Sequence, residues 1–222
     1  MDMTTVEKIL TTTRSVRKRL DLSRDVPLDI VKKCLDLAIQ APTGSNSQQW
    51  RFVLVTDPNK RAELAALYAK SFQLYAKESA AAAPKLEPTD PRAQRMMKVV
   101  TSAVYLSENL AKVPLFVLAC LEGRVEKASV LEQASFYGSI LPATWSLMMA
   151  LRAEGIGSAW TTLHLRYEEE AAKILQIPDN FTQTCLLPVA YFTGQDFRPA
   201  KRVPSEQLTY LNEWGAPAFK TS

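Results

Sequence analysis

The stretch "VPLFVLACLE", residues 113–122, decides the class of fold. Every residue between its proline and its glutamate is apolar, which predicts a strand buried on both faces at the centre of a sheet. Strand character recurs in "RFVLVT" (51–56), "IGSAWTTL" (156–163) and "TQTCLLPVAYFTG" (182–194). Helical patterns separate these segments, so the sequence predicts an α+β or α/β protein.

The clearest helical pattern covers residues 27–41. Leu28, Val31, Leu35, Ala38 and Ile39 form an apolar stripe at helical spacing, Pro27 suits the first turn, and Pro42 ends the helix. Near the N-terminus, Thr4 and Glu7 have the spacing of a capping box for a short helix that ends at Thr11–Thr13. Further helices are expected at 58–83, 91–112, 129–154 (closed by Gly155) and 167–177, with a proline-rich loop at 84–91.

Beyond Gly194 the composition changes. Prolines and scattered apolar residues replace any sustained period, and the apolar side chains argue against a free tail; they are Phe197, Leu208, Tyr210, Leu211 and Trp214. We expect residues 195–222 to form an extended C-terminal arm that packs on another subunit. The whole chain, 1–222, is expected to be a single domain.

Composition excludes several classes of function. The 222 residues carry 27 Lys and Arg against 23 Asp and Glu, a net charge of +4. This charge is too small to indicate nucleic acid but suits an anionic small molecule. The single histidine, His164, makes a zinc site or a histidine-based triad improbable, so no metal is expected.

The cysteines and the apolar runs indicate the compartment. Cys34, Cys120 and Cys185 lie far apart in apolar runs, which predicts buried free thiols in a reducing compartment. The N-terminus resembles no signal peptide, and no apolar run reaches the roughly 18 residues of a membrane helix. We expect a cytoplasmic protein without a membrane partner.

The basic segment "TRSVRKR", residues 13–19, is the first candidate for binding chemistry. On a helical turn Arg14 and Arg17 would share a face with Ser15 beside them, and two guanidinium groups with a hydroxyl suit a phosphate. The alternatives are a solvated basic surface and a nucleic-acid patch. Lys201 and Arg202 pose the same choice in the C-terminal arm.

The loop "APTGSNSQQW", residues 41–50, has more polar groups than a turn needs. Pro42–Asn46 offers free backbone N–H groups and small side chains that let a flat ligand approach closely. The amides of Asn46, Gln48 and Gln49 suit the polar edge of a heteroaromatic ring. An ordinary turn from helix to strand is the alternative.

The third candidate is "GIGSAWTTLHL", residues 155–165. Gly155 and Gly157 match part of a dinucleotide fingerprint, but the third glycine and the preceding strand are missing, so that motif is rejected. Thr161 and Thr162 could donate hydrogen bonds to a ligand, or they are a β-branched pair within a strand. His164 lacks an acidic or nucleophilic neighbour in the sequence, which disfavours a catalytic base.

The order of these pieces resembles the FMN-dependent nitroreductase family over about residues 5–214. The pattern is R-S-x-R, then P-[ST]-G-x-N-x-Q-x-W, then G-x-G-x-x-W-T-T after a long apolar helix, and K-R before the arm. The resemblance implies a three-layer α+β sandwich with a central mixed, mainly antiparallel sheet and helices on both faces. It also implies a homodimer with FMN at the subunit interface and the arm extended over the partner.

The resemblance also assigns residues to FMN. Thr13, Arg14 and Ser15 match the phosphate and ribityl contacts, Arg17 matches the residue near the flavin N1–C2=O edge, and Lys201 with Arg202 matches the arm's phosphate contact. Pro42, Thr43, Gly44 and Asn46 match the loop from the partner subunit, and Thr161, Thr162 and Leu163 the backbone at the N5/O4 edge. The chain departs from the family at Thr13, commonly arginine, at Thr43 and Gln49, commonly serine and proline, and at Thr161–Leu163, where some relatives have Glu-Gly.

The implied activity is ping-pong transfer of hydride from NAD(P)H to nitroaromatic, quinone or similar electron-poor acceptors, with no dedicated catalytic acid or base. A helical excursion, about residues 66–110, would cover the acceptor; its aromatic and methionine side chains are otherwise core, and they are Tyr68, Phe72, Tyr75, Met96, Met97 and Tyr105. Alternatives are a specialised reductase on the same scaffold (a dehalogenase or an enoate-type enzyme) and a non-catalytic flavin-binding protein. No convincing match to the deiodinase-type Glu, Tyr and Lys set was found in the excursion.

Overall fold

The structure is a computed structural model that describes residues 2–82, 87 and 89–220. The chain divides into two compact units, a larger one at Thr13–Gln195 and a smaller one made of Met1–Thr12 with Asp196–Ser222. The larger unit contains the sheet and all but one of the described α-helices.

A four-stranded sheet has the order β1-β2-β4-β3, formed by β1 (Trp50–Val55), β2 (Leu115–Glu122), β4 (Phe181–Tyr191) and β3 (Ile156–Ser158). Each neighbouring pair is antiparallel, and a single parallel bridge joins Ser15 to Ser158 outside the named strands. The prediction for residues 113–122 is confirmed, because β2 is an interior strand whose residues 115–121 are all buried.

Six α-helices are described. They are α1 (Met3–Thr12), α2 (Leu28–Ala38), α3 (Pro58–Ala82), α4 (Pro91–Asn109), α5 (Val130–Ala153) and α6 (Glu168–Leu175), with 3₁₀ turns η1 (Gly44–Asn46), η2 (Leu110–Lys112), η3 (Leu163–Tyr167) and η4 (Ser205–Gln207). A full capping box starts α5, where Ser129 and Glu132 exchange hydrogen bonds. Gly155, with φ of 74°, follows its end as predicted. The expected loop at 84–91 lies largely outside the described residues.

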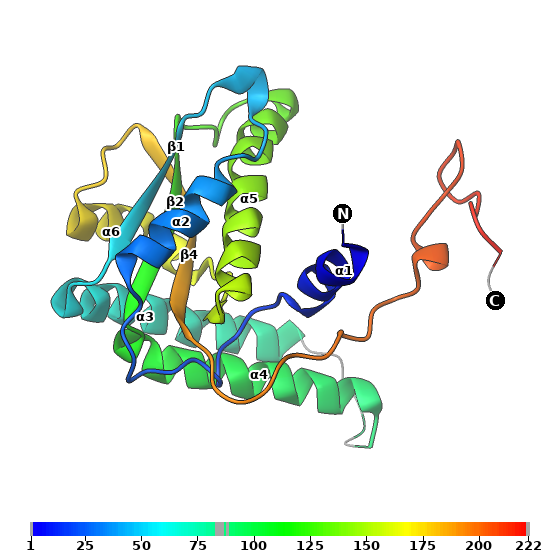
Figure 1. Ribbon diagram of the computed structural model, residues 1–222, viewed down its shortest axis with the longest axis horizontal. Coiled ribbons are helices and arrows are strands. Elements are labelled where there is room, and N and C mark those ends of the chain that lie inside the picture. The colour runs from blue at the N-terminus through cyan, green and yellow to red at the C-terminus, as the bar shows by residue number, and fades with distance from the viewer. Residues whose placement is uncertain (1, 83–86, 88, 221–222) are drawn as a thin grey trace. The chain divides into compact units, whose positions relative to one another are not determined.

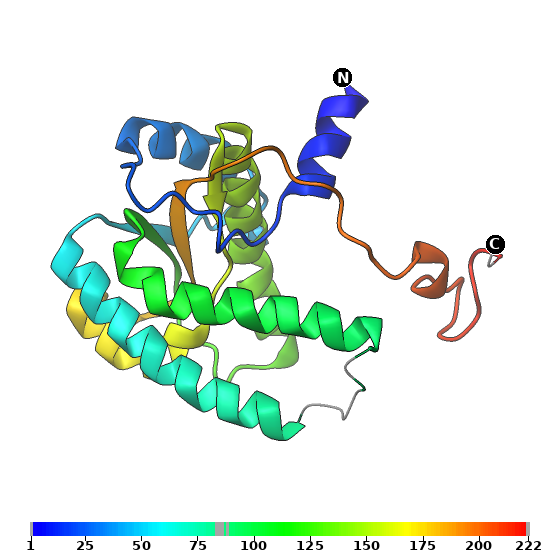
Figure 2. The ribbon, with the colours of Figure 1, turned by 90° about the horizontal axis from the view of Figure 1, so that it is seen from below.

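Helices cover both faces of the sheet, which gives three layers (Figure 1). On one face α2 and α5 pack together over alternate sheet residues such as Val117, Leu187 and Val189. On the other face lie α3, α6, η2 and η3, where Phe116, Leu118 and Leu186 are fully buried. Figure 2 shows α3 and α4 as two long helices that extend past the sheet. None of the helices among the described residues is long and apolar enough to span a bilayer.

Three local predictions are wrong. The N-cap of α1 is Asp2 rather than Thr4, because the Asp2 carboxylate accepts hydrogen bonds from the backbone N–H of Thr4 and Thr5. In α2, Leu28 and Ile39 are exposed and Cys34 is buried, because the face toward the sheet follows Val31, Cys34 and Ala38. Residues 13–17 are extended rather than helical, and a turn follows at 18–19.

Candidate functional site

The basic segment lies along the edge of the sheet. The Val16 N–H donates to the Ser158 carbonyl at 2.8 Å, which places Ser15 beside Ser158, and Val16 and Leu20 are buried. In this extended segment successive side chains alternate, so Arg14 and Arg17 do not share a helical face. The prediction of a shared helical face is therefore corrected. Arg14, Ser15 and Arg17 remain half-buried, and Thr13 is buried.

Gly157 allows this close approach. A Cβ added at Gly157 would lie 3.0 Å from the Val16 Cβ and 3.2 Å from Leu20. The contact with the Val16 Cβ could not be relieved by a change of rotamer, because this atom is attached directly to the backbone. The glycine in the G-x-G pattern therefore serves the pairing of the basic segment with β3.

The segment Thr161–Leu163 continues along the same edge. Thr161 pairs with Leu186 through two backbone hydrogen bonds of 3.2 and 2.9 Å, and its hydroxyl donates to the Leu186 carbonyl at 2.6 Å. The Thr161 hydroxyl is thus bonded within the chain, whereas Thr162 is exposed and Leu163 begins η3. Because Ser158 precedes Thr161 by three residues, the structure brings Ser15 and Thr161–Leu163 to one edge of the sheet.

Tyr68 contributes from the helical layer. It lies on the buried face of α3, and burial raises the pKa of its phenol, an effect that the positive charge of Arg17 partly offsets. The Arg17 charge is therefore close enough to Tyr68 to influence its phenol. Tyr68 therefore belongs to the core as well as to the surroundings of Arg17.

The polar loop has an unusual backbone. Ser45, Asn46 and Gln48 have φ of 52°, 51° and 51°. These values lie in the left-handed region, which residues other than glycine seldom adopt. Such conformations cost on the order of 1 kcal/mol each and cluster at functional sites. Residues 42–49 are exposed except for the half-buried Thr43, and Asn46 Oδ1 accepts a hydrogen bond from Gln48 Nε2 at 3.1 Å.

The loop rests on the first half of α5. The Gly44 N–H donates to Ser139 Oγ at 2.9 Å, and a Cβ on Gly44 would lie 2.7 Å from Ser135 Oγ. Sequence reasoning missed these two serines. The sequence did contain a signal for them, because Ser135 and Ser139 are four residues apart and therefore share one face of the helix.

These contacts divide the predicted residues of the larger unit into two groups. We call residues 13–17 with 156–163 the sheet-edge half and residues 42–48 the loop half. The loop half lies at the N-terminal end of α5, and residues 13–17 lie toward its other end (Figure 1).

Lys201 and Arg202 belong to the smaller unit and are exposed in an extended stretch before η4. Within this unit Lys8 forms an ion pair with Asp196 at 2.9 Å, and the rings of Tyr210 and Trp214 lie 4.9 Å apart. Trp214 is 91% exposed. The arm therefore has local structure but an apolar surface without cover in its own unit.

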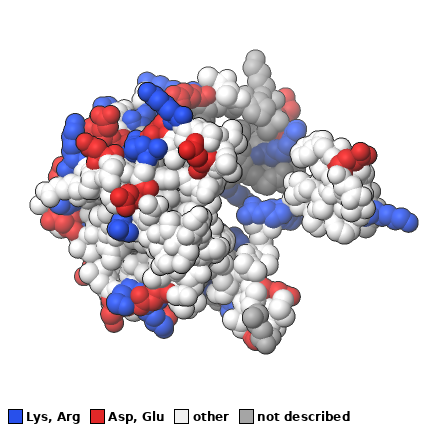
Figure 3. Space-filling view, turned by 90° about the horizontal axis from the view of Figure 1, so that it is seen from above, with Lys and Arg blue, Asp and Glu red and all other residues white. Residues whose placement is uncertain are grey.

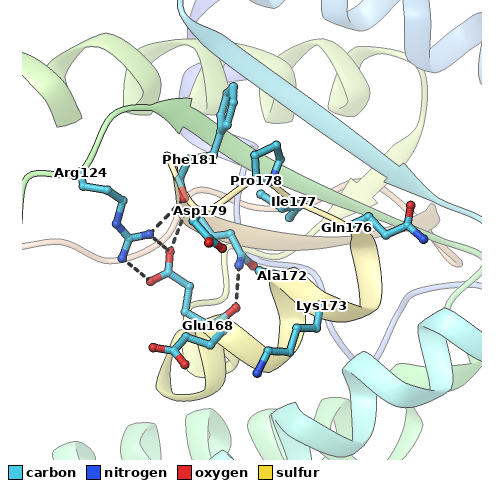
Figure 4. Close-up of a pocket in the computed structure, with 11 residues that line it drawn as sticks. Arg124, Glu168, Ala172, Lys173, Gln176, Ile177, Pro178, Asp179 and Phe181 are labelled. Carbon is cyan, nitrogen blue, oxygen red and sulfur yellow. Dashed lines mark hydrogen bonds and ion pairs between the residues drawn. The ribbon is translucent and has the colours of Figure 1, made fainter.

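A cavity of about 510 Å³ beside α6 is lined by none of the predicted residues (Figure 4). Its wall is the bidentate pair of Arg124 with Glu168, at 2.9 and 3.0 Å. Glu168 also accepts from the Gln183 N–H, and Arg124 donates to the Phe181 carbonyl. These charges join α6 to β4, so we assign them a structural role.

The three cysteine thiols are not reactive nucleophiles. Burial raises the pKa of Cys34 to about 11 and those of Cys120 and Cys185 to about 12, so the three thiols stay protonated. All three are free and buried, as predicted. On the face of the larger unit shown in Figure 3, basic and acidic side chains are interspersed.

Comparisons with known proteins agree with this geometry. The family model described as the nitroreductase family matches residues 10–191. A protein of Archaeoglobus fulgidus, provisionally described as an NADH dehydrogenase/NAD(P)H nitroreductase, is 22% identical over 83% of each chain. An iodotyrosine dehalogenase 1 homolog of Caenorhabditis elegans is 26% identical over 85% of this chain, which spans 56% of that relative's length.

Solved structures share the fold. The FMN-dependent nitroreductase NfnB of Mycobacterium smegmatis, solved with NADPH, has a TM-score of 0.68 and 18% identity over 95% of this chain and 99% of its own. Iodotyrosine deiodinase, solved with FMN and 3-iodo-L-tyrosine, has a TM-score of 0.64 and 20% identity over 100% of both chains. With the family model matched across the sheet and both halves of the site, this chain belongs to the nitroreductase family.

Proposed function

We propose that this chain is an FMN-dependent oxidoreductase that takes hydride from NAD(P)H and reduces nitroaromatic, quinone or similar electron-poor acceptors. One observation supports this most directly. The hydrogen bonds of Val16 with Ser158 and of Thr161 with Leu186 put a half-buried basic segment and a backbone segment along one edge of the sheet. The basic segment suits the anionic group of a flat cofactor, and the backbone segment suits the polar edge of its ring.

The residues present fit FMN. Arg14 and Ser15 would hold the phosphate and the ribityl chain together with Arg202, since a guanidinium and a hydroxyl are suitable phosphate donors. Gly157 leaves the space in which this segment approaches β3. When bound, FMN supplies the hydride chemistry, accepting from the nicotinamide and passing to the acceptor.

The chain's own groups would bind and orient. Arg17 is half-buried and always charged, so it would oppose negative charge at the flavin's N1–C2=O edge. The backbone of Thr161–Leu163 would meet the N5/O4 edge. We assign no side chain the role of general acid or base.

We further propose that the active form is a homodimer. On α5 the residues Leu131, Ala134, Gly138, Leu141 and Trp145 are all exposed. Their alternating spacing of three and four is that of a seam between packed helices, and Ala134 with Gly138 would permit close approach. A second copy would cover this seam and bring its loop half to the first copy's sheet-edge half.

The pair α3 and α4 would cover the acceptor. Tyr68 is buried and Phe72 and Tyr105 are half-buried, whereas Tyr75, Met96 and Met97 are exposed. The exposed members, with Leu74 and Val100, give this pair an apolar surface suited to a flat, uncharged acceptor.

Colour and reducibility test the proposal. Purified protein, or protein reconstituted with FMN, should show a flavin spectrum that NADH or NADPH bleaches without oxygen. A quinone or a nitroaromatic should then restore it, whereas restoration by a halogenated phenol alone would favour a dehalogenase. Protein that takes up no FMN would refute the proposal, and bound flavin that neither nucleotide reduces would favour a binding protein without turnover.

The phosphate assignment has its own test. The double variant Arg14→Ala, Arg202→Ala should retain FMN at least tenfold more weakly, whereas Lys127→Ala, Lys173→Ala removes the same charge elsewhere and should not. Equal retention in both would show that the phosphate is misplaced. A monomer by sedimentation at micromolar concentration would contradict the shared site.

A further inference from the structure

Three buried polar side chains lie between β4 and the helical layer without a full set of partners. His164 on η3 and Ser71 on α3 are 0% exposed, and Gln183 on β4 is 3% exposed. Among the described residues, neither His164 ring nitrogen nor the Ser71 hydroxyl has a hydrogen-bond partner in the protein. Gln183 Nε2 donates to the Glu168 carbonyl, and its Oε1 accepts from no described group.

These residues belong to elements that pack on one another. Helix α3 contacts η3, and η3 contacts β4. Residues three apart in a 3₁₀ turn share a face, so His164 points to the same side as Tyr167. Lys70, next to Ser71, lies 4.4 Å above the Tyr167 ring. The part of α3 that carries Lys70 and Ser71 therefore lies beside η3, the turn that carries His164.

Their chemistry is complementary. A neutral imidazole has one donor and one acceptor, a hydroxyl has both, and an amide oxygen accepts. Leaving such groups buried without hydrogen bonds costs about 1 to 3 kcal/mol each. A buried water with two to four polar neighbours is the usual means of satisfying them.

We propose that a buried water joins His164 to Ser71 and that His164 thereby acts as a positioning residue for the segment Thr161–Leu163. This inference rests on the proposed function for its consequence at the flavin, but the hydrogen-bonded link does not depend on that function. The link would connect the segment at the flavin to α3, one of the two helices assigned to cover the acceptor.

The geometry of η3 explains how His164 would act. The Leu165 N–H donates to the Thr162 carbonyl at 3.0 Å, which closes a tight turn around Leu163 and His164. Thr161 is fixed to Leu186 on the other side. With both ends fixed, the anchoring of the imidazole sets the orientation of the peptide groups on either side of Leu163.

Nitrogen NMR tests the link without flavin. Because His164 is the single histidine, ¹⁵N-histidine labelling of untagged, flavin-free protein reports this ring alone. We expect one neutral tautomer near pH 7 and a displaced ring-nitrogen signal in Ser71→Ala. Ser102→Ala is the matched control, since its hydroxyl bonds to the Val99 carbonyl on α4. An unchanged signal in Ser71→Ala would overturn the proposal.

Variants of the FMN-loaded protein test the positioning role. His164→Phe keeps the ring and removes both nitrogens; we expect an altered flavin reduction potential and about tenfold weaker FMN binding. Ser71→Ala should shift the potential in the same direction, and the double variant should add nothing to His164→Phe because one linked unit is lost. Additive shifts would overturn the proposal.

Two outcomes remain separable from the proposed function. If His164→Phe does not fold, Ser71→Ala alone decides, because an unchanged potential with a displaced ring signal would confine the link to structure and overturn the positioning role. If the ring signal responds to Ser71→Ala but no FMN binds, the proposed function fails while the link stands.

Discussion

The sheet-edge half and the loop half of the candidate site differ in how their conformations are maintained. In the sheet-edge half, Val16 is hydrogen-bonded to β3 and Thr161 to β4 through the backbone, and Val16 and the adjacent Leu20 are buried. The loop half is exposed, has three left-handed residues other than glycine, and contacts α5 through Gly44. The sheet-edge half is therefore buried and paired like a protein core, and the loop half is exposed like a surface that binds a partner.

This difference decides which of the two halves gives evidence for a ligand or a partner. Burial and pairing explain the sheet-edge half without any ligand. The left-handed backbone of the loop half is held by hydrogen bonds to Thr43 and Gly44 within an exposed loop, without the burial that stabilises the sheet-edge half. The loop half is therefore the stronger indication of an external partner, and changes in each half should separate folding from assembly.

The largest expected effect is acid destabilisation of the folded chain through His164, which directly follows the sheet-edge half. Burial lowers the pKa of His164 from 6.5 to about 4, so the unfolded chain binds the proton more readily between these values. The stability contributed by the neutral ring is complete above about pH 6.5 and is lost as the pH falls toward 4, by about 3 kcal/mol in total. Urea unfolding of the flavin-free protein at several pH values measures this loss.

His164→Phe is the control for that experiment. The variant has no ring to protonate, so its stability should change much less between pH 6.5 and 4.5. An equal loss in the variant would show that other groups cause the acid sensitivity and would weaken the contrast between a buried half and an exposed half.

The second effect concerns the pairing of the basic segment. Gly157→Ala places a methyl group 3.0 Å from the Val16 Cβ, and overpacking of this kind costs about 2 kcal/mol. FMN retention should fall at least tenfold because Ser15 moves with Val16. Thermal unfolding and equilibrium dialysis measure the two effects. If the variant is destabilised but still retains FMN at the original level, cofactor binding does not depend on this pairing.

The sequence predicts the elements of the sheet well and the local geometry of the site poorly. An apolar run such as 115–121 needs no partner to be identified as a buried strand. The basic segment was expected to be helical because Arg14 and Arg17 have helical spacing, yet pairing with Ser158 gives it an extended form. That pairing depends on a glycine about 140 residues away in sequence, which no local pattern reveals.

The loop half is a second case in which the sequence predicts the residue types but not their geometry. Its turn residues and polar excess are evident in the sequence, and the resemblance supplied its role. The left-handed conformations of Ser45 and Asn46 were not predicted, because both residue types occur readily in ordinary turns. The contact of Gly44 with Ser139 on α5 is tertiary, so it too was hidden from the chain's local pattern.

A third prediction tests the support of the loop half. A methyl group at Gly44 would lie 2.7 Å from Ser135 Oγ, so Gly44→Ala should displace the loop and weaken FMN retention several-fold. Monomer stability should fall by only about 1 kcal/mol, because the loop is exposed and can shift. Ser135→Ala should restore retention in the double variant by removing the clash. Failure of this rescue would show that Gly44 is needed for another reason, such as direct approach to the cofactor.

The smallest effect, and the one that separates chain stability from assembly, is expected at Gly138. Apart from its chain neighbours and the backbone of its own helix, no atom would lie within 4 Å of a Cβ at Gly138. Replacing a helical glycine by alanine stabilises a helix by about 1 kcal/mol. Gly138→Ala should therefore raise the stability of the separate chain while it weakens the dimer, because the methyl group enters the proposed seam on α5. Unfolding at low protein concentration and sedimentation at high concentration measure the two effects, with Lys127→Ala as a surface control. Stabilisation with unchanged dimerisation would move the interface away from this face of α5, and the loop half would then need another route to its partner.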